Sequence, residues 1–374
     1  MINRIVLSYS GGLATSVAIA WLAETYHAEV VAVTFDVGQG KELDDVRERA
    51  LAIGAARAHV LDLRDEFAKD FVIKALQARA IYEGRYPLAT ALGRPLIAKH
   101  LVEIARIEGA TAIAHGCSGS GHDAIRLDLS IEALNPDLTV LAPAREWDFT
   151  PATMREYARE RGLPVPAAID RAYRIDRNLW GRSIDYGVIE DVRREPPDDI
   201  YLLTKSPLET PDVPAYVDIA FERGVPMTIN GIALSPVELI SSLEAIAGTH
   251  GVGRIDMVEN DRAGIKSREI YEAPAAVALH TAHRELHQLV TPRNLERLTQ
   301  DLGVRYADLV YRGKWYTPMR EAIDALVAKV EETVTGTIRL KFWKGDCRVV
   351  GRESQHALKE RAGDVGFDER AMLD

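Results

Sequence analysis

Hydrophobic positions in the first part of the chain alternate between short apolar runs and stretches with helical spacing. The apolar runs predict strands over residues 4–7, 29–35, 58–61, 111–115 and 139–142. The helical spacing predicts helices over residues 13–26, 43–53, 66–82 and 92–108. Because strands and helices take turns, and the run at 29–35 is almost continuously apolar, we expect a parallel sheet with helices on both faces. The expected fold class is therefore α/β, beginning with a doubly wound parallel-sheet domain over residues 1–164.

The pattern changes in the second part of the chain. A helix capped by Thr150, with Pro151 at its first position, is expected to end near Gly162. After a long connection over residues 195–214, helical spacing returns over residues 236–246, 275–289, 295–302 and 319–332. Asn230-Gly231 indicates a turn between strands, and residues 336–343 and 347–350 predict a hairpin. We expect an α+β domain over residues 165–356 and a charged C-terminal tail over residues 357–374.

The composition limits which binding partners and which cellular compartment we expect. The formal net charge of -10 argues against a nucleic-acid partner, because binding to phosphate backbones calls for a basic face. The two cysteines, Cys117 and Cys347, make no disulfide framework and favour a reducing compartment. No apolar run approaches the ~18 residues that a membrane span needs, and the start of the chain does not resemble a signal peptide. We expect a cytoplasmic protein with neither a nucleic-acid nor a membrane partner.

The most informative stretch is Ser-Tyr-Ser-Gly-Gly-Leu-Ala-Thr-Ser at residues 8–16, between the first strand and the first helix. The small residues Ser10, Gly11 and Gly12 let backbone approach a phosphate, and the start of the helix directs N–H groups and its dipole at the anion. No Gly-Lys-Ser/Thr closes the turn, so it is not a P-loop. It is similar to the Ser-Gly-Gly loop of enzymes that cut ATP between its α and β phosphates. Since parallel strands end at one edge, we expect residues 36–39 and 115–118 to join this turn at one cleft.

Long stretches along nearly the whole chain resemble the argininosuccinate synthase family. Two of them are Asn178-Leu179-Trp180-Gly181-Arg182-Ser183 and Lys266-Ser267-Arg268-Glu269-Ile270-Tyr271-Glu272-Ala273-Pro274. The others are residues 8–16, 36–39, 82–88, 94–99, 115–117, 145–149, 251–260 and 351–354. Matches of this length in this order identify the chain as a member of the family or of a close offshoot.

The resemblance implies an ATP-dependent C–N ligase of arginine biosynthesis. In this family the ureido oxygen of citrulline attacks the α-phosphate of ATP and pyrophosphate leaves, after which the amine of aspartate displaces AMP. Such catalysis depends mostly on positioning and on neutralising phosphate charge. The resemblance further implies ATP and Mg²⁺ as cofactors, citrulline-like and aspartate-like substrates, and a second domain that serves synthesis and assembly into a homotetramer or homodimer.

The resemblance also assigns roles to individual residues. ATP is expected on Ser8, Tyr9, Ser10, Gly11, Gly12, Thr15, Ser16, Phe35 and Gly116. The two substrates are expected on Tyr86, Thr90, Ser118, His122, Asp123, Arg126, Arg174, Ser183, Glu259 and Tyr271. Among these, Ser10, Asp123 and Arg126 are the expected catalytic residues, with Arg126 gripping a carboxylate in bidentate fashion. Without the resemblance, helix caps, a core tyrosine and a surface ion pair would explain Ser10, Tyr86 and Arg126.

Three histidines at helical spacing, His280, His283 and His287, are candidate metal ligands. No carboxylate or cysteine joins them at the spacing of a ligand set, so we expect no metal there.

Departures from the family pattern concentrate in the expected site. Alanine replaces the usual Asp at Ala14, Ser at Ala91 and Gln at Ala124, while Ser120 replaces Lys, His122 Asn, Arg174 Ser and Arg177 Glu. The missing carboxylate at position 14 would have handled Mg²⁺ directly or through water. Arg174 is expected to add a buried cation beside the citrulline head group, which needs an anionic partner. Arg177 is expected beside it.

Two explanations fit these departures. The enzyme uses a shifted substrate pair, whose first member carries an additional anionic group or lacks the α-amine. Alternatively, the chain is a non-catalytic nucleotide-binding or assembly paralogue, as Ala14 and the lost lysine suggest.

Overall fold

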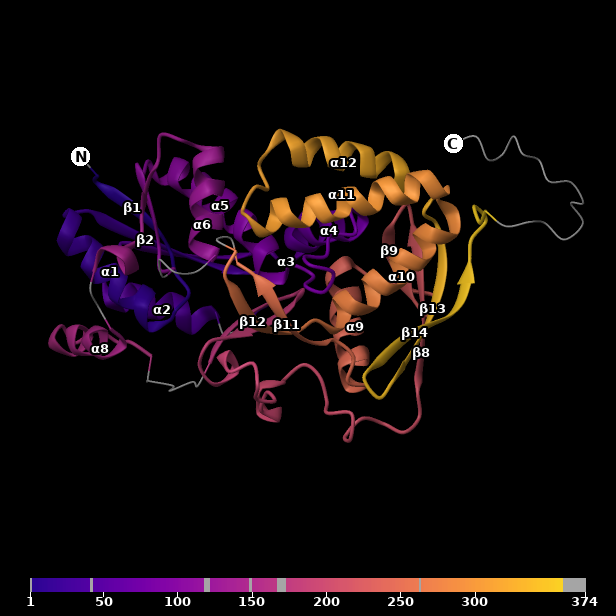
Figure 1. The fold of residues 1–374 in the computed structure, drawn as a ribbon. Coiled ribbons are helices and arrows are strands. Elements are labelled where there is room, and N and C mark those ends of the chain that lie inside the picture. The colour runs from indigo at the N-terminus through magenta and orange to yellow at the C-terminus, as the bar shows by residue number, and fades with distance from the viewer. Residues whose placement is uncertain are drawn as a thin grey trace, which may run out of the picture.

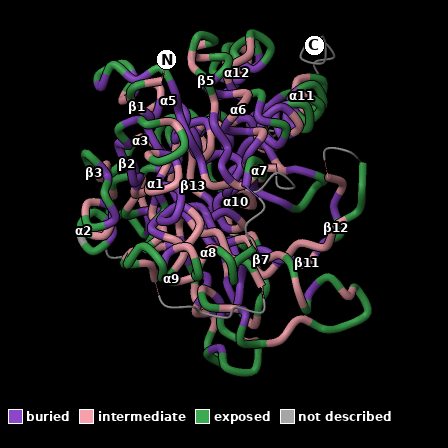
Figure 2. Tube along the Cα trace, turned by 90° about the vertical axis from the view of Figure 1, so that its left-hand side faces the viewer, coloured by how far each residue is buried: buried purple, intermediate pink, exposed green. Residues whose placement is uncertain are grey.

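The computed structural model describes residues 2–40, 43–117, 122–147, 150–166, 173–261 and 264–358. Figure 1 shows two halves side by side, with the indigo-to-magenta first half at the left and the orange-to-yellow end of the chain at the right. Helix α4 of the first half packs against α10 and α12 of the second, so the halves share an extensive interface. In Figure 2 the buried stretches gather in the interior, and most exposed stretches lie at the outside of the molecule.

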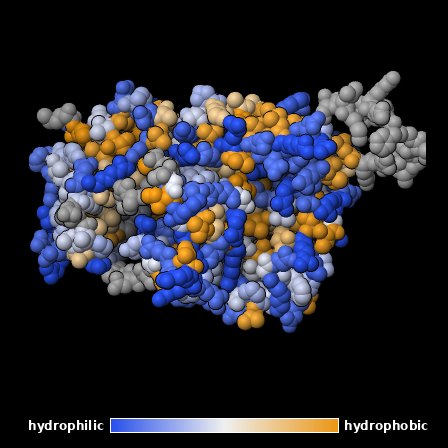
Figure 3. Space-filling view, in the orientation of Figure 1, coloured by the Kyte–Doolittle hydropathy of each residue, from blue (hydrophilic) through white to orange (hydrophobic). Residues whose placement is uncertain are grey.

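The surface is mixed in character. On the face seen in Figure 3, hydrophobic side chains are scattered among hydrophilic ones. No helix in the described part of the chain is long and apolar enough to cross a membrane.

Five parallel strands in the order β3-β2-β1-β4-β5 form the sheet of the first half. Their bounds are β1 (Arg4–Ser8), β2 (Glu29–Asp36), β3 (Arg57–Asp62), β4 (Ala112–His115) and β5 (Thr139–Leu141). Leu7 of β1 lies opposite Ala32 of β2 and Ala114 of β4. The strand order therefore reverses at β1, and the edge beyond the carboxyl ends of β1 and β4 is the position where such sheets bind ligands.

Helices cover both faces of this sheet. They are α1 (Leu13–Tyr26), α2 (Leu43–Ile53), α3 (Arg64–Glu66), the π-helical η1 (Phe67–Val72), α4 (Ile73–Gln77), α5 (Ala89–Glu108), α6 (His122–Leu134), α7 (Pro143–Glu146) and α8 (Pro151–Glu160). Val6 and Val33 pack into one core with Leu92 of α5, whereas Leu7 packs into another with Val17 of α1. The expected doubly wound arrangement is confirmed.

Two antiparallel sheets form the second half. One has the order β10-β9-β8-β13-β14 and the other β11-β12-β7-β6. The strands are β6 (Arg174–Asn178), β7 (Gly181–Asp185), β8 (Ala215–Glu222), β9 (Val225–Ile229), β10 (Ile232–Ala233), β11 (Arg254–Asn260), β12 (Lys266–Glu272), β13 (Gly336–Trp343) and β14 (Asp346–Glu353). The helices are α9 (Pro236–Thr249), α10 (Pro274–Val290), α11 (Arg293–Tyr311) and α12 (Pro318–Val330), with short 3₁₀ segments η2 (Gly187–Glu190), η3 (Asp198–Ile200) and η4 (Glu331–Thr333).

Several local signals of the second part are confirmed. The Thr150 hydroxyl accepts from the Thr153 N–H at 3.2 Å and caps α8. Asn230 and Gly231 join β9 to β10, both with positive φ. The hairpin expected near the end of the chain is the pair β13–β14.

Two helices differ from expectation. The single helix expected over residues 66–82 is instead α3, η1 and α4 in succession, ending at Gln77, and Arg79 follows with a φ of 55°. The helix expected to stop at Leu302 runs on to Tyr311 as α11. This helix runs through Gly303, where a Cβ would lie 2.8 Å from the Ala78 carbonyl oxygen. Glycine therefore permits the helix to pack closely on the end of α4.

Candidate active site

The glycine turn lies between β1 and α1, at the carboxyl edge of the parallel sheet. Gly11 has a φ of +74°, and a Cβ there would lie 3.0 Å from a methyl carbon of Val46. Gly12 precedes the helix with extended backbone, and no side chain caps α1. The first N–H groups of a helix have no acceptor within it. With the helix dipole, they form a site suited to a phosphate.

Thr15 and Ser16 hold this turn together from inside. The Thr15 hydroxyl lies 3.1 Å from the Ser10 hydroxyl and donates to the Gly12 carbonyl at 3.3 Å. Ser16 is fully buried, its hydroxyl lies 3.0 Å from that of Tyr9, and its N–H donates to the Gly12 carbonyl. Both polar groups of Ser16 are engaged inside the protein, so the expected contact of Ser16 with ATP stays a prediction.

Three further residues expected at ATP lie where strands meet the turn. Ser8 is the last residue of β1. The Tyr9 ring is buried, and the Tyr9 N–H donates to the Val33 carbonyl at 2.8 Å. The Phe35 side chain packs into the core, while its carbonyl accepts from the Gln39 amide at 2.6 Å. The Tyr9 side chain thus supports the turn through Ser16, whereas the Phe35 side chain belongs to the core on the other face of the sheet.

Gly116 brings the end of β4 against the turn. A Cβ at Gly116 would lie 2.4 Å from Thr15 Cγ2, so only glycine fits without displacement. The turn after β2 meets the second half, since the Leu179 N–H donates to the Val37 carbonyl at 2.7 Å. The expected meeting of the turns after β1 and β4 is confirmed by the Gly116–Thr15 approach.

Arg49 of α2 is a cation beside the turn that the sequence did not reveal. Its Nη1 donates to the Gly11 carbonyl at 3.0 Å, and Val46, three residues earlier, packs on Gly11. Helical spacing does not distinguish Arg49 from Arg47, which pairs with Glu48 at the surface. Only the packing of α2 on the turn selects Arg49.

The second part of the site is one face of the sheet β11-β12-β7-β6. Tyr271 lies opposite Ser183, Ser183 opposite Asp176, and Arg174 opposite Asp185. Because side chains alternate between faces along a strand, paired residues and every second neighbour share a face. The substrate residues expected from the sequence on these strands share this face with three further carboxyl groups; the full set is Arg174, Asp176, Ser183, Asp185, Glu259, Glu269 and Tyr271. We call it the acidic face.

Tyrosines surround Glu259 at one end of the acidic face. Glu259 is 3% exposed and accepts from the Tyr271 hydroxyl at 2.8 Å and the Tyr311 hydroxyl at 2.6 Å. The Tyr86 ring stacks on Tyr271 with 4.0 Å between centroids, and the Tyr82 ring stacks on Tyr311 with 3.7 Å. Burial raises the pKa of Glu259, and the two hydroxyls oppose that rise. The structure thus brings Tyr86, Tyr271 and Glu259 together and adds Tyr82 and Tyr311, which sequence reasoning missed.

Two arginines and two carboxylates connect α6 to this face. Arg94 of α5 binds Asp123 at 2.7 Å and also Asp176. Arg126 is 4% exposed and binds Asp123 at 2.8 Å and the Tyr311 carbonyl at 2.8 Å. Burial acts to raise the pKa of Asp123, but Arg94 and Arg126 outweigh it and hold that pKa well below its usual range. Arg126 already uses Nε and one Nη within the chain, so a bidentate grip on a substrate carboxylate would use the remaining hydrogens of its two Nη atoms.

Other expected substrate residues lie around this network. The Thr90 hydroxyl lies 2.8 Å from that of Tyr86. The His122 ring lies 5.1 Å from the Tyr311 ring at the start of α6. Ser118, like the departure Ser120, lies outside the described residues.

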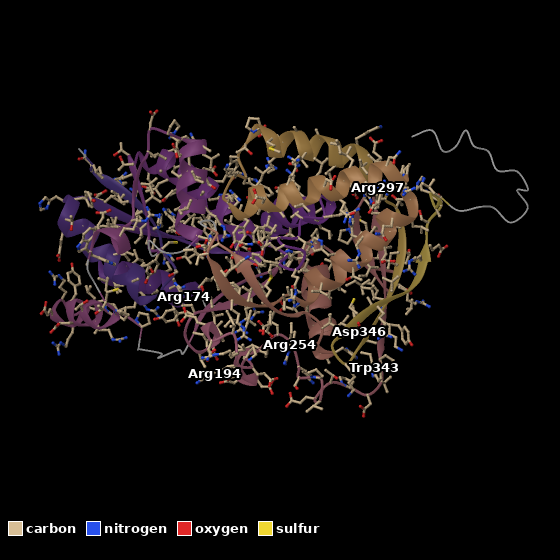
Figure 4. The ribbon with its side chains drawn as sticks, in the orientation of Figure 1. Arg174, Arg194, Arg254, Arg297, Trp343 and Asp346 are labelled. Atoms are coloured by element: carbon tan, nitrogen blue, oxygen red, sulfur yellow. The ribbon has the colours of Figure 1, made fainter. Side chains whose placement is uncertain are left out.

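The two arginines that depart from the family pattern do not lie where the sequence predicted. The Arg174 side chain is 57% exposed, so it is not a buried cation, and its Nε and Nη2 each lie 3.1 Å from an oxygen of Asp185. In Figure 4 Arg174 lies where the two halves meet in this view. Arg177 is on the opposite face of β6 and pairs with Glu244 of α9 at 3.1 Å, so it does not line the acidic face.

Two of the alanines that depart from the family pattern lie in the protein core. Ala91 and Ala124 are fully buried in α5 and α6, so neither offers a surface to a substrate. Ala14 lies in the first turn of α1, which carries no acidic residue.

Burial favours the protonated form of Glu269. Burial, with the charges of Asp185 and Glu259, raises the pKa of Glu269 to about 8, and the nearby Ser267 hydroxyl and Arg174 only partly oppose this. The pKa of Glu269 is raised because this side chain lies in the middle of the acidic face, and among the described residues no guanidinium pairs closely with it.

The histidines of α10 have partners within the chain. His283 lies 2.9 Å from Glu331, and His287 lies 2.5 Å from Glu296. Within the described ranges, no group of three or more His, Cys, Asp or Glu side chains is placed to hold a metal ion.

Comparisons with known proteins cover both halves. The family model described as "Arginosuccinate synthase N-terminal HUP domain" matches residues 4–164, and the one described as "Arginosuccinate synthase C-terminal domain" matches residues 173–374. The argininosuccinate synthase of Symbiobacterium thermophilum is 52% identical over 95% of this chain and 89% of its own length. That of Rubrobacter xylanophilus is 52% identical over 95% and 87%, and that of Dehalococcoides mccartyi 48% identical over 100% and 92%. The chain therefore belongs to the argininosuccinate synthase family of ATP-dependent C–N ligases.

Proposed function

We propose that this ligase adenylates the oxygen of a ureido (citrulline-like) substrate and couples the activated carbon to the amine of an aspartate-like substrate. In the first step the ureido oxygen bonds to the α-phosphorus of ATP and pyrophosphate leaves. In the second the amine nitrogen bonds to the ureido carbon, the carbon–oxygen bond breaks, AMP leaves and the amine loses a proton. Adenylation is needed because a ureido oxygen is a poor leaving group.

The observation that carries this proposal is the short path from the phosphate turn to the acidic face. Gly116 touches Thr15 of the turn, and α6, which begins at His122, carries Asp123 and Arg126 into the tyrosine-lined end of the acidic face. A nucleotide on the turn and a small acid on that face are thus served by one stretch of chain. This supports transfer between a phosphate and a substrate atom.

Residues of the chain supply positioning and charge. The N–H groups at the start of α1 would receive phosphate oxygens, with Ser10 and Thr15 hydroxyls beside them. Asp123 and Arg126 would orient the two acids, Arg126 through the remaining hydrogens of its two Nη atoms. No acidic residue lies in the first turn of α1, so Mg²⁺ would enter with the phosphates and rely on them and on water, as this ion commonly does.

The same absent carboxylate favours a second candidate, a nucleotide-binding paralogue without turnover. Pyrophosphate release distinguishes the two. We expect release with ATP, Mg²⁺, aspartate and a member of a ureido panel that includes citrulline. Arg126→Gln should abolish most of it, whereas Arg159→Gln, at an exposed position of α8, should not. Binding of ATP without pyrophosphate from any member of the panel would favour the paralogue.

We also propose that the second half assembles the chain into a homotetramer or homodimer. Light scattering after size exclusion measures this directly, and a monomeric mass would contradict it.

A further inference from the structure

His115 is fully buried at the carboxyl end of β4, directly opposite Ser8 at the end of β1. Its Nε2 lies 2.9 Å from Asp128 Oδ1 on α6, and its Nδ1 accepts from the Cys117 N–H at 3.3 Å. Because Nδ1 is an acceptor, the ring proton is on Nε2, and the imidazole donates to Asp128. One side chain therefore joins the strand end beside the phosphate turn to the helix that carries the expected substrate residues.

Asp128 completes this connection from the side of the helix. Its second oxygen accepts from Arg145 Nη2 of α7 at 2.7 Å, so the carboxylate holds β4, α6 and α7 together. Burial acts to raise the pKa of Asp128, but the hydrogen bonds from His115 and Arg145 outweigh it and lower that pKa. The carboxylate is therefore ionised at neutral pH and forms a charge-assisted hydrogen bond with His115.

Helix α6 is held on two nearly opposite sides. On one side Arg126 donates to the Tyr311 carbonyl, and on the other Asp128 binds His115. Residues 126 and 128 project about 200° apart, because each residue turns an α-helix by about 100°. The helix also packs through buried Leu127, but apolar packing is not directional, whereas a hydrogen bond specifies the rotation of the helix. The bond to His115 thus fixes the direction in which Arg126 points.

We propose that His115 is a positioning residue, which through Asp128 holds α6 so that Arg126 meets the small acids. Because His115 is fully buried, it acts through Asp128 rather than by touching a substrate. Its place beside Gly116 keeps α6 in a fixed relation to the phosphate turn. A displacement of about 1 Å in such groups can cost about 100-fold in rate, so the loss of this bond is measurable. The inference rests on the proposed function for the place of the acids beside α6.

Two substitutions of His115 separate its two hydrogen bonds. The amide of glutamine reaches the position of Nε2, so His115→Gln keeps the bond to Asp128. The amide of asparagine reaches only the position of Nδ1, so His115→Asn keeps the acceptor for the Cys117 N–H and loses Asp128. We expect His115→Asn to weaken the binding of L-aspartate and L-citrulline about tenfold, and His115→Gln to bind both within about twofold of the unaltered chain.

Calorimetry on the full chain, with Mg²⁺ and a non-hydrolysable α,β-methylene analogue of ATP, measures the affinities for both acids and for the nucleotide. The affinity for the analogue should stay the same in every variant, whereas a general disturbance of the fold would weaken all three ligands. Asp128→Ala removes the acceptor and should match His115→Asn. His59→Asn is the matched control, because it removes a histidine–carboxylate pair, with Glu108 at 3.2 Å, on β3 and should change no affinity.

The outcomes separate this inference from the proposed reaction. Equal effects of His115→Asn and His115→Gln, unchanged acid affinities in His115→Asn, a parallel loss of nucleotide affinity, or binding of neither acid to the unaltered chain overturns the positioning role. The expected affinities without pyrophosphate release would sustain the positioning role and overturn the proposed reaction. Pyrophosphate release that His115→Asn leaves unchanged at low concentrations of the acids would do the reverse. Thermal melting checks that each variant is folded, and Asp128→Ala decides the question where His115→Asn is not.

Discussion

The sharpest stability prediction concerns Glu269. Its pKa is about 8 in the folded chain, against 4.5 for an ordinary glutamate, because it is partly buried among Asp185 and Glu259. The folded state therefore binds a proton that the unfolded chain gives up between those two pH values. The contribution of Glu269 to stability is complete below pH 4.5, falls as the pH rises, and is lost above the folded pKa of about 8.

The magnitude follows from the same two values. At about 1.4 kcal/mol per pH unit, the interval corresponds to an upper value of about 5 kcal/mol. Water at the open edge of the acidic face screens part of this, so we expect a loss of about 2–3 kcal/mol between pH 5 and pH 9. Glu269→Gln keeps the shape of the side chain and remains neutral throughout. At pH 9 it should be more stable than the unaltered chain by that amount, and at pH 5 nearly equal to it.

Urea denaturation at several pH values between 5 and 9 measures the difference between the two proteins. Other groups titrate in this interval, but they are common to both chains and cancel in the comparison. Glu195→Gln, at an exposed position, is the matched control and should follow the unaltered chain at every pH. Parallel curves for Glu269→Gln and the unaltered chain would refute the reasoning, because Glu269 would then be ionised at no cost.

Three further predictions concern the turn and the tyrosine cluster. Ala14→Asp should tighten ATP binding about tenfold with Mg²⁺ and weaken it with a chelator, as calorimetry would measure; the same change in both conditions would contradict a role in Mg²⁺ binding. Gly116→Ala should weaken ATP binding about tenfold because its methyl group would lie 2.4 Å from Thr15 Cγ2, and adding Thr15→Ser should restore most of the affinity; no effect of the first change would show that the contact yields freely. Tyr311→Phe should reduce the free energy of unfolding by about 1–2 kcal/mol in chemical denaturation, since Glu259 loses a hydroxyl donor at 2.6 Å; unchanged stability would mean that water replaces it.

The spacing of apolar residues predicted the elements that depend only on residues close together in the sequence. The helix over residues 13–26 and the pairing of β13 with β14 follow from periodicity and turn residues a few positions apart. It failed over residues 66–82, where apolar spacing is compatible with one helix but the structure has a π-helical segment and an end at Gln77, next to the contacts of α4 with α10 and α12. The helical spacing over residues 295–302 also stopped short, since α11 runs on through Gly303, where the missing side chain leaves room for the Ala78 carbonyl.

In the candidate site, too, the sequence predicted some residues and missed others. The resemblance selected Glu259 and Tyr271, and the structure brings them together, but Tyr311 and Arg49 carry no local signal. Arg174 was expected to be a buried cation, a prediction that was wrong because its side chain is 57% exposed at the edge of the sheet.

By itself the sequence determined the alternation of strands and helices, the glycine turn that suits a phosphate, and the family. These depend on spacing and backbone freedom within a few residues. Only the tertiary structure decided that Arg174 meets Asp185 and Arg177 meets Glu244, and that four carboxyl groups share one face of the sheet. The reason is that strand register, which sets the neighbours of a side chain, arises from packing between segments far apart in the chain.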